Sequence, residues 1–174
     1  ASPRHHVLIL TRRATHHVLV QVTQQATRRH RLRRPRRQTH LSINRGKRSV
    51  AIDLDEPDAA DPLRALMAGA DLVVESDRPG RLERRGLGPE VLSAWNPTLA
   101  LVRISPFGQT GPYRDRPASD LVVQAAGGWV SAHGLPGTAA VRVGGRIPEY
   151  LAGAFASTSA LTAVRAARDK QEFI

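Results

Sequence analysis

The larger, C-terminal part of the chain alternates short apolar runs with segments of helical spacing. Residues 48–54, 71–75 and 99–105 are short and apolar and end near Pro, Asp or Ser, which is typical of buried strands. Residues 62–70 and 89–95 lie between them and place apolar side chains three and four positions apart. Strands and helices that alternate through short connections predict a parallel sheet covered on both faces. We therefore expect an α/β fold with a doubly wound, mostly parallel, Rossmann-like sheet.

A Gly/Pro-rich loop follows the last apolar run. Residues 104–117, ISPFGQTGPYRDRP, leave the carboxyl end of a predicted strand, where α/β proteins place ligands. A glycine-interrupted helix is expected over 118–134, and a short strand, VRV, over 141–143. A glycine turn then leads to a long helix over about 150–169, with the carboxylate of Glu149 at its start. These features predict a ligand-binding end of the molecule.

Positive charge is concentrated at the N-terminus. The 174 residues carry a formal net charge of +11. Residues 1–52 hold 13 Lys and Arg and no Asp or Glu, whereas residues 53–174 hold 13 Lys and Arg against 15 Asp and Glu. Six of the seven His also precede residue 41. We therefore divide the chain into a basic segment over 1–40 and a domain over 41–174 that ends in a long helix.

Three interpretations of residues 1–40 stay open. A basic arm could bind nucleic acid through phosphate contacts, but no aromatic side chain is interleaved for stacking. The repeated HHVL at 5–8 and 16–19 suggests metal ligation, but neighbouring residues of a strand point to opposite faces. A composition rich in Arg, His, Thr and Gln is also what a shifted reading frame of GC-rich DNA tends to give. We favour this third interpretation and do not expect a nucleic-acid partner.

The composition excludes several classes of protein. The chain has no Cys, which rules out disulfides, Cys-ligated zinc and thiol catalysis. No apolar run reaches the roughly 18 residues of a membrane span. We therefore expect a cytoplasmic protein with no membrane partner.

Four stretches resemble the class III CoA-transferase family, which includes formyl-CoA transferases and α-methylacyl-CoA racemases. They are NRGKRSVAIDL at 44–54, ADLVVESDRPGRLERRGLG at 70–88, NPTLALVRISPFGQTGPYRDRPASDLVVQAAGG at 96–128 and GGRIPEYLAG at 144–153. Their order and spacing make the resemblance specific, and it covers residues 41–170. Family members are about twice as long or more, so the resemblance implies that 41–174 is part of a large domain and that the chain is a fragment.

The resemblance implies a CoA transferase that moves CoA between an acyl-CoA and a carboxylic acid. A carboxylate attacks the thioester and gives a mixed anhydride, so coenzyme A takes part as a substrate and no metal is needed. In the family the nucleophile is an Asp in the pattern I-x-D-x-x-x-G, and I-P-E-Y-L-A-G here places Glu149 at that position. Full-length relatives form interlinked homodimers, a topology that we do not expect of this chain.

The resemblance also assigns residues to CoA. Arg84 matches an arginine that contacts the nucleotide, in keeping with guanidinium recognition of phosphate. Pro79 and Gly80 match the turn before it. The remaining nucleotide-side residues match a basic pair and an adenine-pocket residue, and are Lys47, Arg48 and Ile52.

Further residues match the thioester side of the family's site. Gly108, Gly111 and Tyr113 match the loop over the active site. Gly144 and Gly145 permit a close backbone approach beneath the thioester.

Alternatives to transfer chemistry stay open as well. One is an inactive remnant that folds without activity. Another is an acyl-CoA racemase of the same family, but Ser119 stands where racemases carry a His base. The one remaining His nearby, His133, fits a helix end better than a catalytic role.

Overall fold

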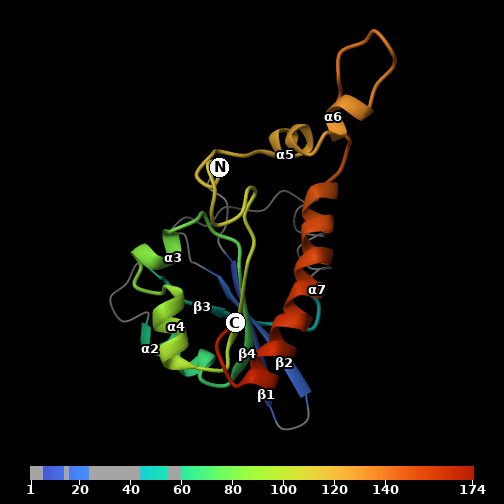
Figure 1. Ribbon diagram of the computed structural model, residues 1–174. Coiled ribbons are helices and arrows are strands. Elements are labelled where there is room, and N and C mark those ends of the chain that lie inside the picture. Colours follow the sequence, from blue (N-terminus) through green and yellow to red (C-terminus); the bar gives the residue numbers. More distant parts are fainter. Residues whose placement is uncertain (1–5, 14–15, 24–43, 55–59) are drawn as a thin grey trace.

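The computed structural model describes residues 6–13, 16–23, 44–54 and 60–174 (Figure 1). The strands in these ranges are β1 (His6–Arg13), β2 (His16–Thr23), β3 (Arg48–Ala51), β4 (Ala70–Glu75) and β5 (Ala100–Arg103). The helices are α2 (Ala60–Met67), α3 (Arg81–Arg84), α4 (Pro89–Trp95), α5 (Asp120–Ala126), α6 (Trp129–Ala132) and α7 (Ile147–Lys170). The α/β fold class predicted from the sequence is confirmed.

The strands form one sheet in the order β3-β2-β1-β4-β5. β2 pairs with β3, and β4 with β5, in parallel. β1 is antiparallel to both of its neighbours, β2 and β4. The β1–β2 connection is much too short for the crossover of a dozen or more residues that a parallel pair requires, so these two strands form a hairpin. Four strands therefore share one direction and the central β1 opposes them.

Helices cover both faces of the sheet, as a doubly wound fold requires. Val73 of β4 packs in a cluster with Leu63 of α2 and Leu92 of α4. The preceding residue, Leu72, packs in a second cluster with Ala160 of α7. Figure 1 shows α2, α3 and α4 on one side of β4 and α7 on the other. Alternate side chains of the strand thus enter two separate apolar layers.

The expected elements are present with shifted ends. The helical spacing seen at 62–70 corresponds to α2, which begins two residues earlier, at Ala60, and ends three residues earlier, at Met67. The predicted strand over 141–143 is wrong, because these residues belong to no strand and the backbone of Val143 bonds to the Gln124 side chain instead. The sheet includes β1 and β2 and so continues on both sides of the predicted boundary at residue 40. That boundary, and the basic run before it, lie outside the described residues.

The C-terminal end of α7 is fastened to the sheet. Arg168 Nη2 lies 2.9 Å from Asp71 Oδ1 at the start of β4. Beyond the helix, Ile174 accepts a hydrogen bond from Leu101 N at 2.8 Å and donates one to Leu99 O at 3.2 Å. These contacts extend the sheet past β5 and fix one end of the helix.

No helix within the described ranges has both the length and the apolarity of a membrane span.

A buried amide joins α4 to the turn between α2 and β4. Asn96 is 8% exposed, and its Nδ2 donates to Met67 O at 2.9 Å and to Ala70 O at 2.8 Å. Its Oδ1 accepts from the backbone N and the hydroxyl of Thr98, each at 3.1 Å. One side chain therefore bonds to the carbonyl at the end of α2 and to the carbonyl at the start of β4.

Replacing Asn96 by Asp should destabilise the fold, because a carboxylate would face two carbonyls with no donor. We expect Asn96→Asp to lower the free energy of unfolding by about 1–3 kcal/mol or more, as measured by urea denaturation. Thr162→Ala is the control, since this exposed hydroxyl bonds only within α7. Equal midpoints for the two variants would contradict the assignment.

Candidate functional site

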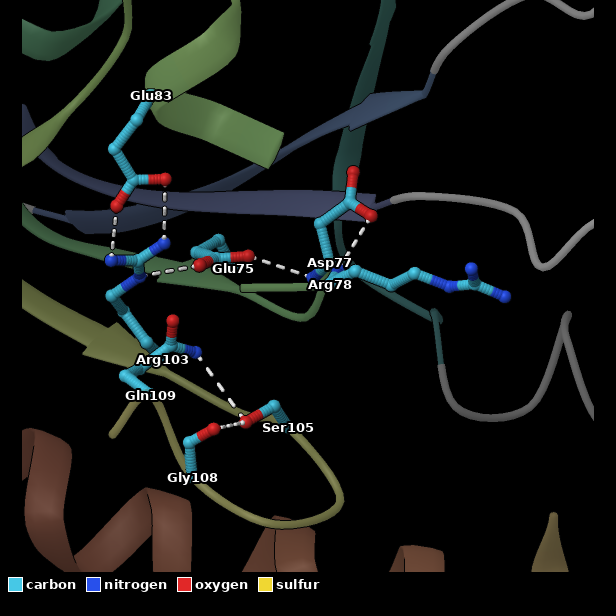
Figure 2. A network of polar contacts seen from close by, with 8 residues as sticks. All are labelled: Glu75, Asp77, Arg78, Glu83, Arg103, Ser105, Gly108 and Gln109. Atoms are coloured by element: carbon cyan, nitrogen blue, oxygen red, sulfur yellow. Dashed lines mark hydrogen bonds and ion pairs between the residues drawn. The ribbon is translucent and has the colours of Figure 1, made fainter. Parts of the chain in front are cut away.

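A network of charged side chains lies where β4 and β5 end (Figure 2). Glu75, the last residue of β4, is 1% exposed and accepts a hydrogen bond from Arg103 Nε at 2.6 Å. Arg103, the last residue of β5, also donates from Nη1 and Nη2 to the two carboxylate oxygens of Glu83 at 2.7 and 3.2 Å. One guanidinium therefore joins both strand ends to α3.

The pairing changes the acidity of its members. The hydrogen bond from Arg103 lowers the pKa of the Glu83 carboxyl and outweighs burial, which acts in the opposite direction. Burial alone would lower the pKa of Arg103, but the hydrogen bonds to Glu83 and Glu75 outweigh it, and the pKa is raised. Both shifts favour the charged forms. The Arg103–Glu83 bridge is therefore stable at neutral pH.

The network fixes where the next loop begins. Ile104 N donates to Glu75 O at 2.9 Å, which carries the β4–β5 pairing one residue beyond β5. Within the loop, Ser105 Oγ donates to Gly108 O at 2.7 Å. Gly108 and Gly111 have φ values of 81° and 86°, a region that favours glycine. The Gly/Pro-rich stretch thus forms a defined turn at the strand end.

Aromatic side chains close this loop. Tyr113 is 51% exposed, and its ring centroid lies 6.1 Å from that of Phe107 in an edge-to-face arrangement. The Arg116 guanidinium lies 4.0 Å from the centre of the Tyr113 ring, within cation–π range. The exposed tyrosine is thus held between a ring and a cation.

The basic residues of α3 are partly neutralised. Asp77 N donates to Glu75 Oε2 at 2.7 Å, and Asp77 Oδ1 accepts from Arg78 N at 2.7 Å (Figure 2). Asp77 Oδ2 lies 3.3 Å from Arg81 Nε and 3.8 Å from Arg85 Nη1. Asp77 therefore compensates two of the arginines in this turn.

Arg84 folds back over the turn that precedes α3. Gly80 has a φ of 75°, and a Cβ built on it would lie 3.2 Å from Arg84 Nη1. Pro79 beside it is buried. The backbone conformation therefore favours glycine at this position, and the guanidinium lies close enough to contact any larger side chain there.

The other predicted nucleotide-side residues lie around β3. Lys47 Nζ donates to Asn44 Oδ1 at 3.1 Å, and Arg48 is exposed. Ile52 is 8% exposed and belongs to the apolar cluster that includes Leu82 of α3. Because β3 and β5 are opposite edges of the sheet, Arg48 and the 104–113 loop begin from different edges.

A buried glutamine holds the segment before α7. Gln124 of α5 is 2% exposed, and its Oε1 accepts from Val143 N at 2.7 Å while its Nε2 donates to Val143 O at 3.1 Å. The same Nε2 donates to Asp120 Oδ2 at 2.9 Å, and that carboxylate oxygen lies 3.0 Å from Arg142 Nη1. We call these four residues the Gln124 clamp. The amide takes the place of a strand partner for Val143.

Glu149 lies directly beyond the clamped segment, in the first turn of α7. Gly145 has a φ of 81°, in the region that favours glycine, whereas the φ of Gly144 is not positive. The Glu149 carboxylate forms an ion pair with Arg146 and is 57% exposed. The structure thus places the predicted nucleophile at a helix start, in contact with solvent.

An apolar hollow of about 210 Å³ adjoins this turn. α5 and α6 form one wall and the start of α7 the other, and the lining residues are Val123, Gln124, Gly127, Trp129, Pro148 and Leu151. His133 ends α6, and its Nδ1 lies 2.7 Å from Trp129 O, which agrees with the predicted helix-end role. Sequence reasoning did not predict this hollow.

Among the residues that the structure describes, no three His, Asp or Glu side chains are grouped as metal ligands.

The sequence profile of CoA-transferase family III matches residues 20–172. The beta subunit of succinyl-CoA–L-malate CoA-transferase from Chloroflexus aurantiacus is 41% identical over 128 residues, 73% of this chain and 32% of that protein. The probable fatty acyl-CoA transferase Rv3272 of Mycobacterium tuberculosis is 43% identical over 96 residues, 55% of this chain and 24% of that protein. A crystal structure of a CAIB/BAIF family protein from Brucella suis has a TM-score of 0.70 at 30% identity, over 74% of this chain and 34% of that one. The chain spans about a third or less of each of these proteins.

Acid should weaken the contribution of Glu83 to stability. Its folded pKa lies below the ordinary glutamate value of about 4.3, so the contribution is present above that pH and lost as the pH falls through the lowered pKa. We expect Glu83→Gln to reduce the unfolding free energy at pH 7, with the deficit shrinking below about pH 4. Urea unfolding across the pH range measures this.

Glu172→Gln is the matched control, because Glu172 is 55% exposed and pairs with Lys170 at the surface. It should change stability little at any pH. A Glu83→Gln deficit that stayed constant down to about pH 2 would refute the role of ionised Glu83.

Removing the Gln124 amide should release Val143. We expect Gln124→Ala to speed hydrogen exchange of the Val143 amide by up to about tenfold, since a net hydrogen bond contributes about 0.5–1.5 kcal/mol. Gln109→Ala, which removes a loop amide near Ser105, is the control and should leave Val143 unaffected. Unchanged exchange of Val143 in Gln124→Ala, followed by NMR, would exclude the clamp.

Proposed function

The chain belongs to CoA-transferase family III, and on that premise we propose that it forms the acyl-CoA-binding and nucleophile-bearing part of a CoA transferase. The substrates are an acyl-CoA and a carboxylic acid, and the net reaction exchanges CoA between them. The observation that carries the proposal is the position of Glu149 at the start of α7, directly after a glycine turn in a clamped segment.

In the proposed first step, a carboxylate oxygen of Glu149 bonds to the thioester carbonyl carbon. The C–S bond then breaks, and CoA leaves as the thiolate with the electron pair. The product is a mixed anhydride between the acyl group and Glu149. The thiolate next attacks the Glu149 carbonyl, which releases the first acid and leaves a glutamyl-CoA thioester. A carboxylate oxygen of the acceptor acid then attacks the carbonyl carbon of this thioester and releases the CoA thiolate, which gives a second mixed anhydride. The thiolate finally attacks the acceptor's carbonyl carbon, so that the acceptor leaves as its CoA thioester and the Glu149 carboxylate is regenerated. Each step is an acyl exchange, so no oxidant or reductant is required.

The first turn of a helix suits this chemistry. Backbone N–H groups at a helix start point outward, and the helix dipole favours negative charge there. Both effects would stabilise the oxyanion that develops during attack. Arg146 supplies a further positive charge beside Glu149.

The nucleotide end of CoA would lie at the turn before α3. Arg84 is the proposed phosphate contact, with Pro79 and Gly80 shaping the turn. Lys47, Arg48 and Ile52 are proposed to complete the nucleotide site. The loop with Gly108, Gly111 and Tyr113 would cover the thioester, above Gly144 and Gly145.

Ser119 favours transfer over racemisation. It is the N-cap of α5, where its hydroxyl accepts from Val122 N at 3.4 Å. A hydroxyl in this role is no general base, so the position that bears a His in racemases contributes a helix cap here.

The proposal extends to the protein's setting. We place it in the cytoplasm, where acyl-CoA substrates are available, without a metal cofactor and without a nucleic-acid or membrane partner. Homodimers are proposed for full-length relatives, and residues 1–40 are proposed to lie outside the CoA-binding part.

Hydroxylamine trapping tests the nucleophile. An anhydride or thioester on Glu149 reacts with hydroxylamine to give a hydroxamate at that residue, which peptide mass spectrometry locates. We expect the 174-residue chain incubated with butyryl-CoA to give this product and Glu149→Gln to give none. Glu172→Gln, at an exposed surface pair, should react like the unchanged chain. Binding of CoA without any hydroxamate would leave a binding protein and no transferase.

A further inference from the structure

The hollow between α5 and α7 presents no charged side chain. Its six lining residues are apolar except Gln124, which is 2% exposed. We infer that this hollow binds the acyl group of the CoA thioester and selects short, uncharged aliphatic groups over dicarboxylic ones such as succinyl. The inference rests on the proposed function and adds to it the class of substrate.

The one polar lining residue is already fully engaged. Gln124 Oε1 and Nε2 both bond to the backbone of Val143, and Nε2 also bonds to Asp120. A bound group that took these hydrogen bonds would break the clamp that holds the segment before α7. Only the methylene groups of Gln124 therefore remain to contact a ligand, and the lining acts as an apolar surface.

The hollow adjoins the start of α7, the helix that bears the candidate nucleophile. Pro148 and Leu151, three residues apart on one face of the helix, line it, and Glu149 lies in the first turn on a neighbouring face. An acyl group joined to the Glu149 carboxylate is tethered at that turn. The apolar wall next to it is then the nearest surface on which an alkyl chain can leave water.

A second carboxylate finds no charged partner on the lining of the hollow. Before acyl transfer, the nearby guanidiniums of Arg142 and Arg146 pair with Asp120 and Glu149. A dicarboxylic acyl group would bring its free carboxylate from water to an apolar surface. An alkyl group meets no such opposition.

The size of the hollow suits a short acyl chain. Its volume of about 210 Å³ is below the roughly 300–1,000 Å³ of pockets for drug-sized ligands. A group of a few carbons fits this space, while a long fatty acyl chain would extend beyond it. The inferred substrate thus differs from the succinyl-CoA in the name of the Chloroflexus relative.

Calorimetric titrations of the 174-residue chain with CoA, butyryl-CoA and succinyl-CoA test the inference. We expect butyryl-CoA to bind about tenfold more tightly than CoA, and succinyl-CoA to gain nothing over CoA. Equal affinities for butyryl-CoA and succinyl-CoA would overturn the inference.

A charge placed on the wall should reverse the selection. Leu151 is 42% exposed, so Leu151→Lys is expected to fold and to offer an ammonium group to a free carboxylate. This variant should bind succinyl-CoA several-fold more tightly than butyryl-CoA. Leu161→Lys is the matched control on the same helix, at a residue that is 76% exposed and does not line the hollow. The same reversal in Leu161→Lys would refute a role for the hollow.

A nucleotide-free probe separates this inference from the proposed function. S-butyryl-N-acetylcysteamine carries the acyl thioester without the nucleotide, and its binding should shift the NMR resonances of Trp129. If the probe binds, CoA does not, and butyryl-CoA binds no more tightly than the probe, the nucleotide site of the proposed function fails and the acyl site remains. If the probe leaves Trp129 unchanged, the inferred site is wrong whatever CoA does.

Discussion

The ion pair between Glu75 and Arg103 is the interaction on which the arrangement of the strand ends β4 and β5 depends. A carboxylate with 1% of its surface exposed is costly to bury unless a partner and hydrogen bonds compensate it. Arg103 provides both and at the same time reaches Glu83 in α3. Two parallel strands and a helix are therefore held in one arrangement at the edge where the loops begin. The loop after β5 and the arginine-rich turn before α3 take their positions from this one guanidinium.

A second polar device acts on the other side of the candidate site. The Gln124 clamp replaces a missing strand partner for Val143, so the segment before α7 is held although it belongs to no sheet. Asp120 fixes the orientation of the amide, because its carboxylate can accept only from Nε2. The ion pair at the strand ends and the Gln124 clamp before α7 together fix the position of Glu149 at the surface.

The sequence predicted the periodic features and missed those that depend on pairing. Leu63, Leu92 and Val73 were expected in the core because apolar spacing reports burial directly. The partners of Glu75 and Gln124 lie 28 and 19 residues away, and no local pattern reveals such contacts. The Glu75–Arg103 contact did leave one sign in the sequence, because each of these charged residues lies at or near the end of an apolar run. The strand expected at 141–143 was wrong because its pattern cannot distinguish a strand partner from a side-chain amide. The assignment of Glu149 came from family resemblance and stays a prediction.

Because α7 is anchored at its C-terminal end, a small tilt there displaces its N-terminal end. Its C-terminal end is tied to the sheet through Arg168 and the residues beyond it, while Glu149 lies about 30 Å away at 1.5 Å per residue. Over that length, a tilt of about 2° at the anchored end moves the carboxylate by about 1 Å. A displacement of this size can cost on the order of a hundredfold in rate. In the proposed reaction, contacts at Asp71 and Leu101 would therefore help to fix the position of the Glu149 carboxylate, although they lie at the other end of α7.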